Sequence, residues 1–221
     1  AKSARLLAVQ ARYRAGGGRA ARERRRRGSR VRSACFAPMA AHPVPVPKLV
    51  AFDLDDTVWF PELYMLGGSP FRQDLEGRVF DRESTELKVY PAARSALQRL
   101  SEEPQFAQTQ VAIVSRTEHE QWALECLGRF TIPSGRPFRD IASHFEIYGG
   151  SKQRHFFEIA KRTGIAYHEM LFFDNERWNI TQCAELGVVS IFTPNGMREG
   201  SFEAGLDEFA RKTPTLAKIH L

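Results

Sequence analysis

From residue 49 onward, short apolar runs alternate with longer segments in which apolar residues recur at helical spacing. The apolar runs are continuous enough to predict strands buried on both faces, and they span 49–52, 111–114, 170–173 and 188–192. The segments with helical spacing span 91–103, 118–127, 152–163 and 179–186. Strands that alternate with helices in this way predict an α/β fold, in which a parallel sheet is covered by helices on both faces.

Residues 59–90 interrupt this alternation, because they are loop-like and contain three glycines. We interpret this stretch as a small hairpin flap inserted after the first strand. The gap between Ser115 and Lys152 holds about 36 residues, which is enough for a helix and a strand but not for a separate lid. The predicted architecture is therefore a Rossmann-like α/β sandwich with a minimal hairpin flap and no large cap.

The basic charge of the chain is concentrated in its first 40 residues, which hold 12 Lys and Arg against one acidic residue. By subtraction from the totals of 32 basic and 26 acidic residues, the part from 41 to 221 carries 20 basic and 25 acidic side chains, a net charge of −5. This mildly acidic part does not favour nucleic acid as a partner. We divide the chain into a basic segment with a proline-rich linker at 1–46, a folded domain at 47–215 and a C-terminal tail at 216–221.

Residues 1–40 have the composition of an organelle transit peptide, since they are rich in Arg, Ala, Gly and Ser and almost lack acids. Three other interpretations stay open. They are a disordered basic arm, a patch for nuclear import or nucleic-acid binding, and a translated leader ahead of a start at Met39. We expect a cytoplasmic protein, or a chloroplast or mitochondrial one if the segment is a genuine transit peptide.

The cysteine content argues against a disulfide-rich or zinc-binding protein, and the hydropathy argues against a membrane protein. Cys35, Cys126 and Cys183 are too few and too scattered for a disulfide framework or a zinc site, so we expect free thiols. No apolar run approaches the roughly 20 residues that a membrane helix needs, which predicts no membrane partner. The oligomeric state does not follow from the sequence, and a monomer is the default expectation.

Polar residues follow three of the predicted buried strands at the point where each strand ends. The clusters occupy 53–57 (D-L-D-D-T), 115–117 (S-R-T) and 174–176 (D-N-E). In an open parallel sheet, ligands bind beyond the carboxyl ends of the strands. We therefore expect the three clusters to converge on one site.

Asp53 and Asp55 are two residues apart, so both carboxylates point to the same side if the chain stays extended there. Crowded carboxylates resist joint ionisation, and a divalent cation relieves that repulsion. Hard oxygen ligands of this kind suit Mg²⁺, which takes one or two carboxylates, several waters and a substrate phosphate. A solvated acidic turn that closes a strand is the alternative explanation for this cluster alone.

These motifs, in this order, resemble those of the haloacid dehalogenase superfamily. Residues 50–57 look like its first motif, Ser115 its second, Lys152 its third and 174–175 its fourth. Its magnesium-dependent phosphatase branch has sequences similar to V-S-R-T at 114–117, G-S-K at 150–152 and F-F-D-N-E at 172–176. The resemblance covers about residues 47–212 and leaves the basic segment unexplained.

The resemblance implies a role for each matching residue. Asp53 would be the nucleophile and a metal ligand, and Asp55 the general acid and base, with its backbone carbonyl on the metal. Asp174 and Asn175 would complete the Mg²⁺ ligands, although the branch usually has a second acid where Asn175 stands. The residues expected to bind phosphate or substrate are the amide of Leu54, Thr57 (which would also orient the loop), Glu62, Ser115, Arg116 and Lys152.

The residues also allow alternative or additional roles for Lys152, Ser115 and Asn179. Lys152 could be a solvated lysine at a helix start, and Ser115 could be a helix cap as well as a ligand. Asn179 would lie one helical turn beyond Asn175 and order that loop. Each of these depends on where the helices begin.

The implied activity is hydrolysis of phosphomonoesters through an aspartyl-phosphate. An uncovered site suits small phosphates or the phosphorylated side chain of a protein. The branch resemblance implies phosphotyrosine-like aryl phosphates, and with them protein tyrosine phosphatase activity, and phosphorylated sugars or glycated amines. The expected specificity residues are in the flap: Trp59, Phe60, Glu62 and Tyr64. The alternative is that they only pack the hairpin onto the core. The alternatives are a phosphoryl-transfer enzyme and a catalytically weak module that binds phosphate or a partner on the same scaffold.

Overall fold

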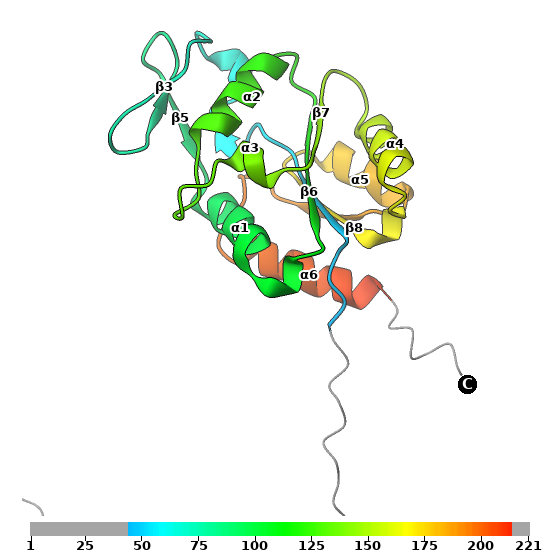
Figure 1. Ribbon diagram of the computed structural model, residues 1–221. Coiled ribbons are helices and arrows are strands. Elements are labelled where there is room, and N and C mark those ends of the chain that lie inside the picture. Colours follow the sequence, from blue (N-terminus) through cyan, green and yellow to red (C-terminus); the bar gives the residue numbers. More distant parts are fainter. Residues whose placement is uncertain (1–43, 214–221) are drawn as a thin grey trace, which may run out of the picture. The chain divides into compact units, whose positions relative to one another are not determined.

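A five-stranded parallel sheet lies at the centre of the fold (Figure 1). The structure is a computed structural model and describes residues 44–213, so the predictions for residues 1–40 and for the tail at 216–221 lie outside the described residues. The strands are ordered β7-β6-β1-β8-β9, and every neighbouring pair is parallel. They are β1 (Leu49–Phe52), β6 (Gln110–Ser115), β7 (His144–Ile147), β8 (Met170–Asp174) and β9 (Val189–Phe192).

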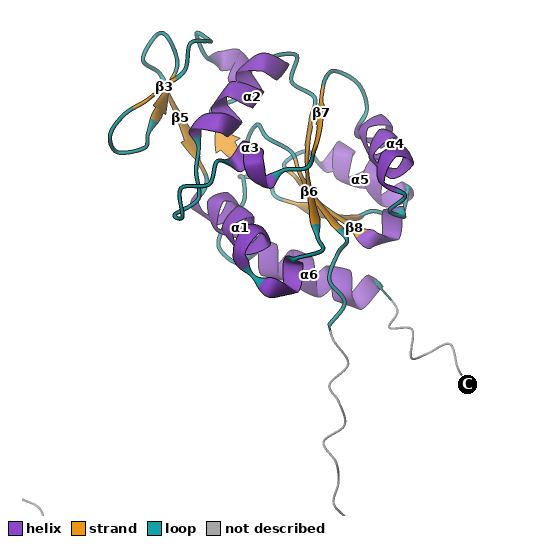
Figure 2. Ribbon diagram, in the orientation of Figure 1, coloured by secondary structure: helices purple, strands orange, loops and turns teal. Residues whose placement is uncertain are grey.

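Helices cover both faces of this sheet, as predicted (Figure 2). Alternate residues of β1 face opposite sides, so that Val50 and Phe52 join one hydrophobic core and Leu49 and Ala51 the other. The first core is closed by α1 (Pro91–Glu102), α2 (Glu120–Arg129), α3 (Phe138–Ile141) and α6 (Ser201–Lys212). The second is closed by α4 (Lys152–Thr163) and α5 (Arg177–Glu185). Short 3-10 turns are η1 (Leu63–Met65), η2 (Pro104–Phe106) and η3 (Tyr167–Glu169).

The structure corrects several predicted elements. The run at 188–192 is not buried on both faces, because β9 is an edge strand whose last three residues are partly exposed. The helix predicted at 118–127 begins at Glu120, and the one predicted at 179–186 begins at Arg177. By contrast, α4 spans the predicted residues, because Ser151 caps its start by accepting a hydrogen bond from the Arg154 amide and Gly164 ends it in a left-handed conformation.

The flap is larger than the predicted hairpin. It is a four-stranded antiparallel sheet in the order β2-β5-β4-β3. Its strands are β2 (Trp59–Phe60), β3 (Arg72–Gln73), β4 (Val79–Phe80) and β5 (Glu86–Val89). Within the described residues there is no separate cap domain, in agreement with the prediction.

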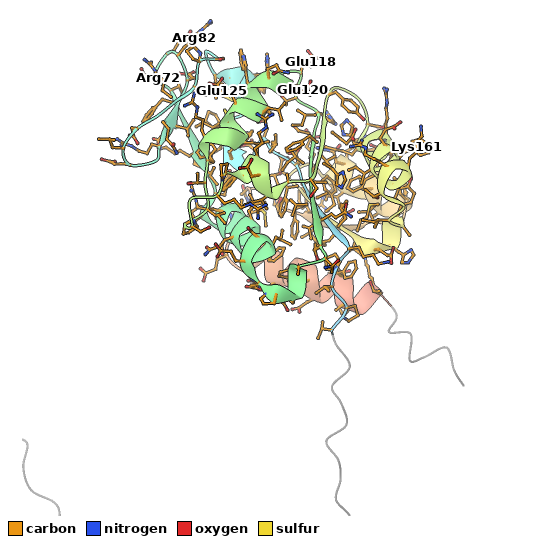
Figure 3. All side chains as sticks on the ribbon, viewed as in Figure 1. Arg72, Arg82, Glu118, Glu120, Glu125 and Lys161 are labelled. Carbon is orange, nitrogen blue, oxygen red and sulfur yellow. The ribbon has the colours of Figure 1, made fainter. Side chains whose placement is uncertain are left out.

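The flap is attached to α2, and Figure 3 labels Arg72 and Arg82 on the flap and Glu125 on this helix. The Glu125 carboxylate accepts hydrogen bonds from the Ser69 hydroxyl (2.8 Å) and the Phe71 amide (3.0 Å). The Phe71 ring packs edge-on against Trp122 of α2, with centroids 6.3 Å apart. These contacts hold the flap beside the carboxyl ends of the parallel strands.

Two further sequence expectations concern cysteines and membranes. Cys126 and Cys183 are buried free thiols, as predicted, and Cys35 lies outside the described residues. None of the helices between residues 44 and 213 is long and apolar enough to cross a lipid bilayer.

Helix α6 lies against the sheet at Gly205, where a side chain has no room. A Cβ there would lie 2.5 Å from the Phe173 ring, and this buried ring cannot move easily because it stacks on Phe52 at 5.5 Å. We expect Gly205→Ala to lower the free energy of unfolding by about 1–3 kcal/mol through overpacking, measured by urea denaturation.

Gly128→Ala is the matched control, because Gly128 lies in α2 and a Cβ at this position would have no other atom within 4 Å. There the higher helix propensity of alanine should raise the free energy of unfolding by about 0.5–1 kcal/mol. A similar gain for Gly205→Ala would contradict the close contact between α6 and Phe173.

Candidate active site

The three polar clusters converge at the carboxyl ends of β1, β6 and β8, where a pocket of about 290 Å³ opens. Most of the predicted site residues line it, namely Asp53, Asp55, Glu62, Ser115, Arg116, Lys152 and Asn175. Leu54, Thr57 and Asp174 are buried behind this lining. The sequence interpretation missed five lining residues, Thr117, Glu118, His119, Glu176 and Asn179, to which it assigned no contact with the ligand, whereas Tyr64 lines the pocket as expected of a specificity residue.

Lys152 is the centre of a buried charge cluster at the base of the pocket. Its side chain is 1% exposed, and its Nζ lies 2.5 Å from Asp53 Oδ1 and 3.4 Å from Asp174 Oδ2. It also donates to the Val114 carbonyl at the end of β6. The solvated-lysine interpretation is therefore wrong, because the first residue of α4 points into the protein and joins three strands.

Asp174 lies under the pocket with both carboxylate oxygens in hydrogen bonds. Its Oδ1 accepts from the Glu176 amide at 2.6 Å, and Asn179 Nδ2 lies 3.1 Å from Oδ1 and 3.0 Å from Oδ2. Burial raises the pKa of Asp174, and the charge of Asp53 raises it further, whereas Lys152 acts in the opposite direction. Asn179 thus orders the loop after β8, as predicted.

Arg116 borders the pocket but is tied to the loop after β8. Its Nη1 lies 3.2 Å from Glu176 Oε2 and 3.2 Å from Asn179 Oδ1. The guanidinium is partly exposed. The guanidinium that was expected to contact a phosphoryl group thus has Glu176 and Asn179 as its partners here.

Thr57 supports the site from behind instead of binding substrate. Its side chain is fully buried. The Thr57 hydroxyl accepts a hydrogen bond from the backbone N–H of Asn175 (3.0 Å) and donates one to the side-chain oxygen Oδ1 of Asn175 (3.4 Å). The Leu54 side chain is also fully buried, and its carbonyl accepts the amides of Thr57 and Val58 to close the turn. Thr57 was expected among the substrate contacts, and this placement corrects that expectation in favour of loop orientation.

Ser115 ends β6, lines the pocket and is 1% exposed. Its Oγ accepts from the Thr117 amide at 3.3 Å. The residue before α2 is His119, so Ser115 is not a helix cap. Its hydroxyl closes a turn at the wall of the pocket.

Asp55 is held by the flap. Its Oδ1 accepts from the indole Nε1 of Trp59 at 2.8 Å and from the Leu63 amide at 3.1 Å. Burial raises the pKa of Asp55 to about 6, opposed by the Trp59 hydrogen bond and reinforced by the charge of Asp53. Trp59 is fully buried and Phe60 lies away from this pocket, so neither is the predicted substrate contact, whereas Glu62 and Tyr64 do line the pocket.

The donor set fits a hard divalent cation. The carboxylates of Asp53 and Asp174 face the single positive charge of Lys152, and burial together with the charge of Asp53 raises the pKa of Asp174. The Asp55 carbonyl and the Asn175 amide would supply neutral oxygens, which Mg²⁺ accepts. Residues 44–213 contain no cluster of three or more His, Cys, Asp and Glu arranged to hold a metal, so such a site relies on these oxygens and on substrate.

A family model described as Acid Phosphatase matches residues 45–212. The chain belongs to this family. It is also 37% identical over 166 residues to human magnesium-dependent phosphatase 1, an alignment that spans 75% of this chain and 89% of the relative. The resemblance to the magnesium-dependent phosphatase branch of the haloacid dehalogenase superfamily is thereby confirmed.

Two solved structures share the fold of this acid phosphatase family member. One is the N-terminal part of a Bacteroides fragilis protein that contains a phosphatase domain complexed with Mg, with a TM-score of 0.53, 16% identity, and coverage of 77% of this chain and 42% of that chain. The other is a haloacid dehalogenase-like hydrolase from Xanthomonas campestris, with a TM-score of 0.52, 14% identity, and coverage of 76% and 98%. At these identities the likeness concerns the fold alone.

The raised pKa of Asp55 predicts a pH dependence of stability. An acid whose pKa is higher in the folded state binds its proton more tightly there, so its contribution to stability is present below pH 3.8 and is lost as the pH rises through about 6. In a chelating buffer we expect this loss to be on the order of 3 kcal/mol. Urea denaturation between pH 4 and 7 measures it.

Asp55→Asn should remove this part of the pH dependence. The matched control is Asp207→Asn, which removes one carboxylate from the exposed face of α6. If Asp55→Asn and Asp207→Asn give the same pH profile of stability, the environment inferred for Asp55 is wrong.

Proposed function

We propose that this member of the acid phosphatase family hydrolyses phosphomonoesters with Mg²⁺ and forms an aspartyl-phosphate on Asp53. The observation that carries the proposal is the position of Asp53, whose carboxylate lies at the base of the pocket against the buried ammonium of Lys152. A nucleophile needs one oxygen facing the substrate and a fixed orientation, and the contact with Lys152 supports both. The magnesium dependence in the human relative's name agrees with the oxygen donors of the site.

In the first step, an Asp53 carboxylate oxygen attacks phosphorus and the bond from phosphorus to the leaving oxygen breaks. Asp55 transfers its proton to that oxygen, and its pKa of about 6 suits a group that must hold a proton near neutral pH. Ser115 and Lys152 stabilise the phosphoryl oxygens with hydrogen bonds and positive charge. When bound, Mg²⁺ neutralises negative charge on Asp53 and on the phosphoryl group, so that the two anions can approach.

In the second step, water attacks the aspartyl-phosphate. Asp55, now a carboxylate, accepts the proton of that water, and the bond between phosphorus and Asp53 breaks to release inorganic phosphate. The site returns to its starting protonation state. Because the same group acts first as acid and then as base, Asp55 must keep one orientation throughout the cycle.

We further propose two substrate groups, phosphotyrosine-like aryl phosphates and phosphorylated sugars or glycated amines. Tyr64 lines the pocket with 66% of its surface exposed, which offers a face for an aromatic leaving group. Glu62 and Glu118 line the same pocket and can accept hydrogen bonds from sugar hydroxyls or an amine. The pocket is open beyond these residues, which leaves room for a phosphorylated side chain of a protein.

Asp53→Asn should lower the turnover of p-nitrophenyl phosphate by at least about a thousandfold, because it removes the nucleophile. Wild-type turnover should require Mg²⁺ and stop with a chelator. The matched control is Asp56→Asn, a change of the same size at a residue that does not line the pocket and whose φ of 51° asparagine tolerates. Folded wild-type protein without turnover would favour the phosphate-binding module instead.

Tyr64→Ala should raise KM for aryl phosphates roughly two- to tenfold, the effect of losing one aromatic contact, and change KM for sugar phosphates less. Met65→Ala is the control, because Met65 is the neighbouring exposed residue of η1 and does not line the pocket. Steady-state kinetics with phosphotyrosine and a sugar phosphate provide the measurement. Equal KM changes for both substrates would exclude Tyr64 as an aryl contact.

A further inference from the structure

We infer that Trp59 is a positioning residue for proton transfer, which orients the Asp55 carboxyl group through its indole N–H. This inference rests on the proposed function, in which Asp55 is the general acid and base. The sequence interpretation assigned Trp59 to the substrate, but its ring is fully buried and it does not line the pocket. The indole Nε1 of Trp59 donates a hydrogen bond to Asp55.

Both hydrogen bonds from the flap reach the same oxygen of Asp55. The Trp59 indole and the Leu63 amide donate to Oδ1 at 2.8 Å and 3.1 Å. An oxygen that accepts two hydrogen bonds has both lone pairs engaged, so the proton of a neutral Asp55 is carried by Oδ2. The two donors therefore select Oδ2 as the oxygen that exchanges protons with the leaving group and with water.

Trp59 is itself held too firmly to follow a moving carboxylate. Its amide donates to the Leu54 carbonyl (3.2 Å), and its carbonyl accepts from the Asp56 amide (2.8 Å). Its ring packs against Phe130, with centroids 6.2 Å apart. Because both the backbone amide and the backbone carbonyl of Trp59 are hydrogen-bonded, its indole N–H has a fixed direction. The Asp55 carboxyl group therefore takes the orientation that the flap gives it.

Loss of the Trp59 hydrogen bond should slow hydrolysis most for substrates whose leaving group needs a proton from Asp55. Phenolate is a much poorer leaving group than p-nitrophenolate, so phenyl phosphate depends more strongly on the general acid. The ratio kcat/KM reports steps up to departure of the leaving group. Hydrolysis of the aspartyl-phosphate needs the base whichever substrate formed it.

The decisive experiment compares Trp59→Phe with wild type on phenyl phosphate and p-nitrophenyl phosphate. We expect kcat/KM to fall about 10- to 100-fold for phenyl phosphate and less than about threefold for p-nitrophenyl phosphate. For the latter, kcat and KM should fall together, and the first turnover should appear as a burst, because the aspartyl-phosphate accumulates. The ratio of the two kcat/KM values does not depend on the folded fraction of the preparation.

Two further variants separate positioning from structural support. Trp122→Phe, which removes an indole from the packing of α2 on the flap at Phe71, should leave the ratio unchanged. Trp59→Phe added to Asp55→Asn should cause no further change in the ratio, since Trp59 acts through Asp55. If Trp59→Phe does not fold, Trp59→Met also lacks the donor and fills the space flexibly.

The inference is overturned, and the proposed function left intact, if the wild type is active and Trp59→Phe has the same ratio of kcat/KM for phenyl phosphate to kcat/KM for p-nitrophenyl phosphate. A further change of the ratio in the double variant would also overturn it. A folded wild type with no metal-dependent turnover would instead remove the proposed function on which the inference rests.

Discussion

The buried contact of the Lys152 ammonium with Asp53 and Asp174 is the interaction on which the rest of the site depends. Taking a charge out of water costs several kcal/mol unless a partner lies beside it, so these side chains are tolerable only together. They come from the end of β1, the end of β8 and the first turn of α4. The register of the parallel strands and the cap at Ser151 therefore determine the electrostatics of the pocket as well as the packing of the core.

One lysine does not balance the carboxylates around it, and this imbalance prepares the site for a cation. The structure compensates Asp174 with hydrogen bonds from Asn179 and the Glu176 amide, whereas Asp53 remains on the pocket floor. Asn175, where the related branch usually has an acid, keeps an oxygen beside the pocket without adding negative charge. Its contacts with Thr57 tie the loop after β8 to the loop after β1.

The flap contributes to the pocket lining and also contacts Asp55. Trp59 and the Leu63 amide donate hydrogen bonds to Asp55, and Glu125 of α2 anchors the flap. Its exposed residue Tyr64 lines the pocket. The flap thus links two pocket-lining residues, Glu62 and Tyr64, to the side chain of Asp55.

The sequence by itself determined the sheet, the order of the motifs and the convergence of Asp53, Ser115, Lys152 and Asp174, since buried strands have a strong apolar signal and their carboxyl ends share one edge. It did not reveal β7, because this edge strand carries His144 and Glu146 among its four residues, and the interpretation passed over the helical spacing of Phe202, Leu206 and Phe209 in α6. Whether Lys152 was solvated or buried, and whether Trp59 faced substrate or Asp55, was decided only by the tertiary structure. Side-chain direction depends on contacts between residues distant in the chain, and local periodicity carries no information about them.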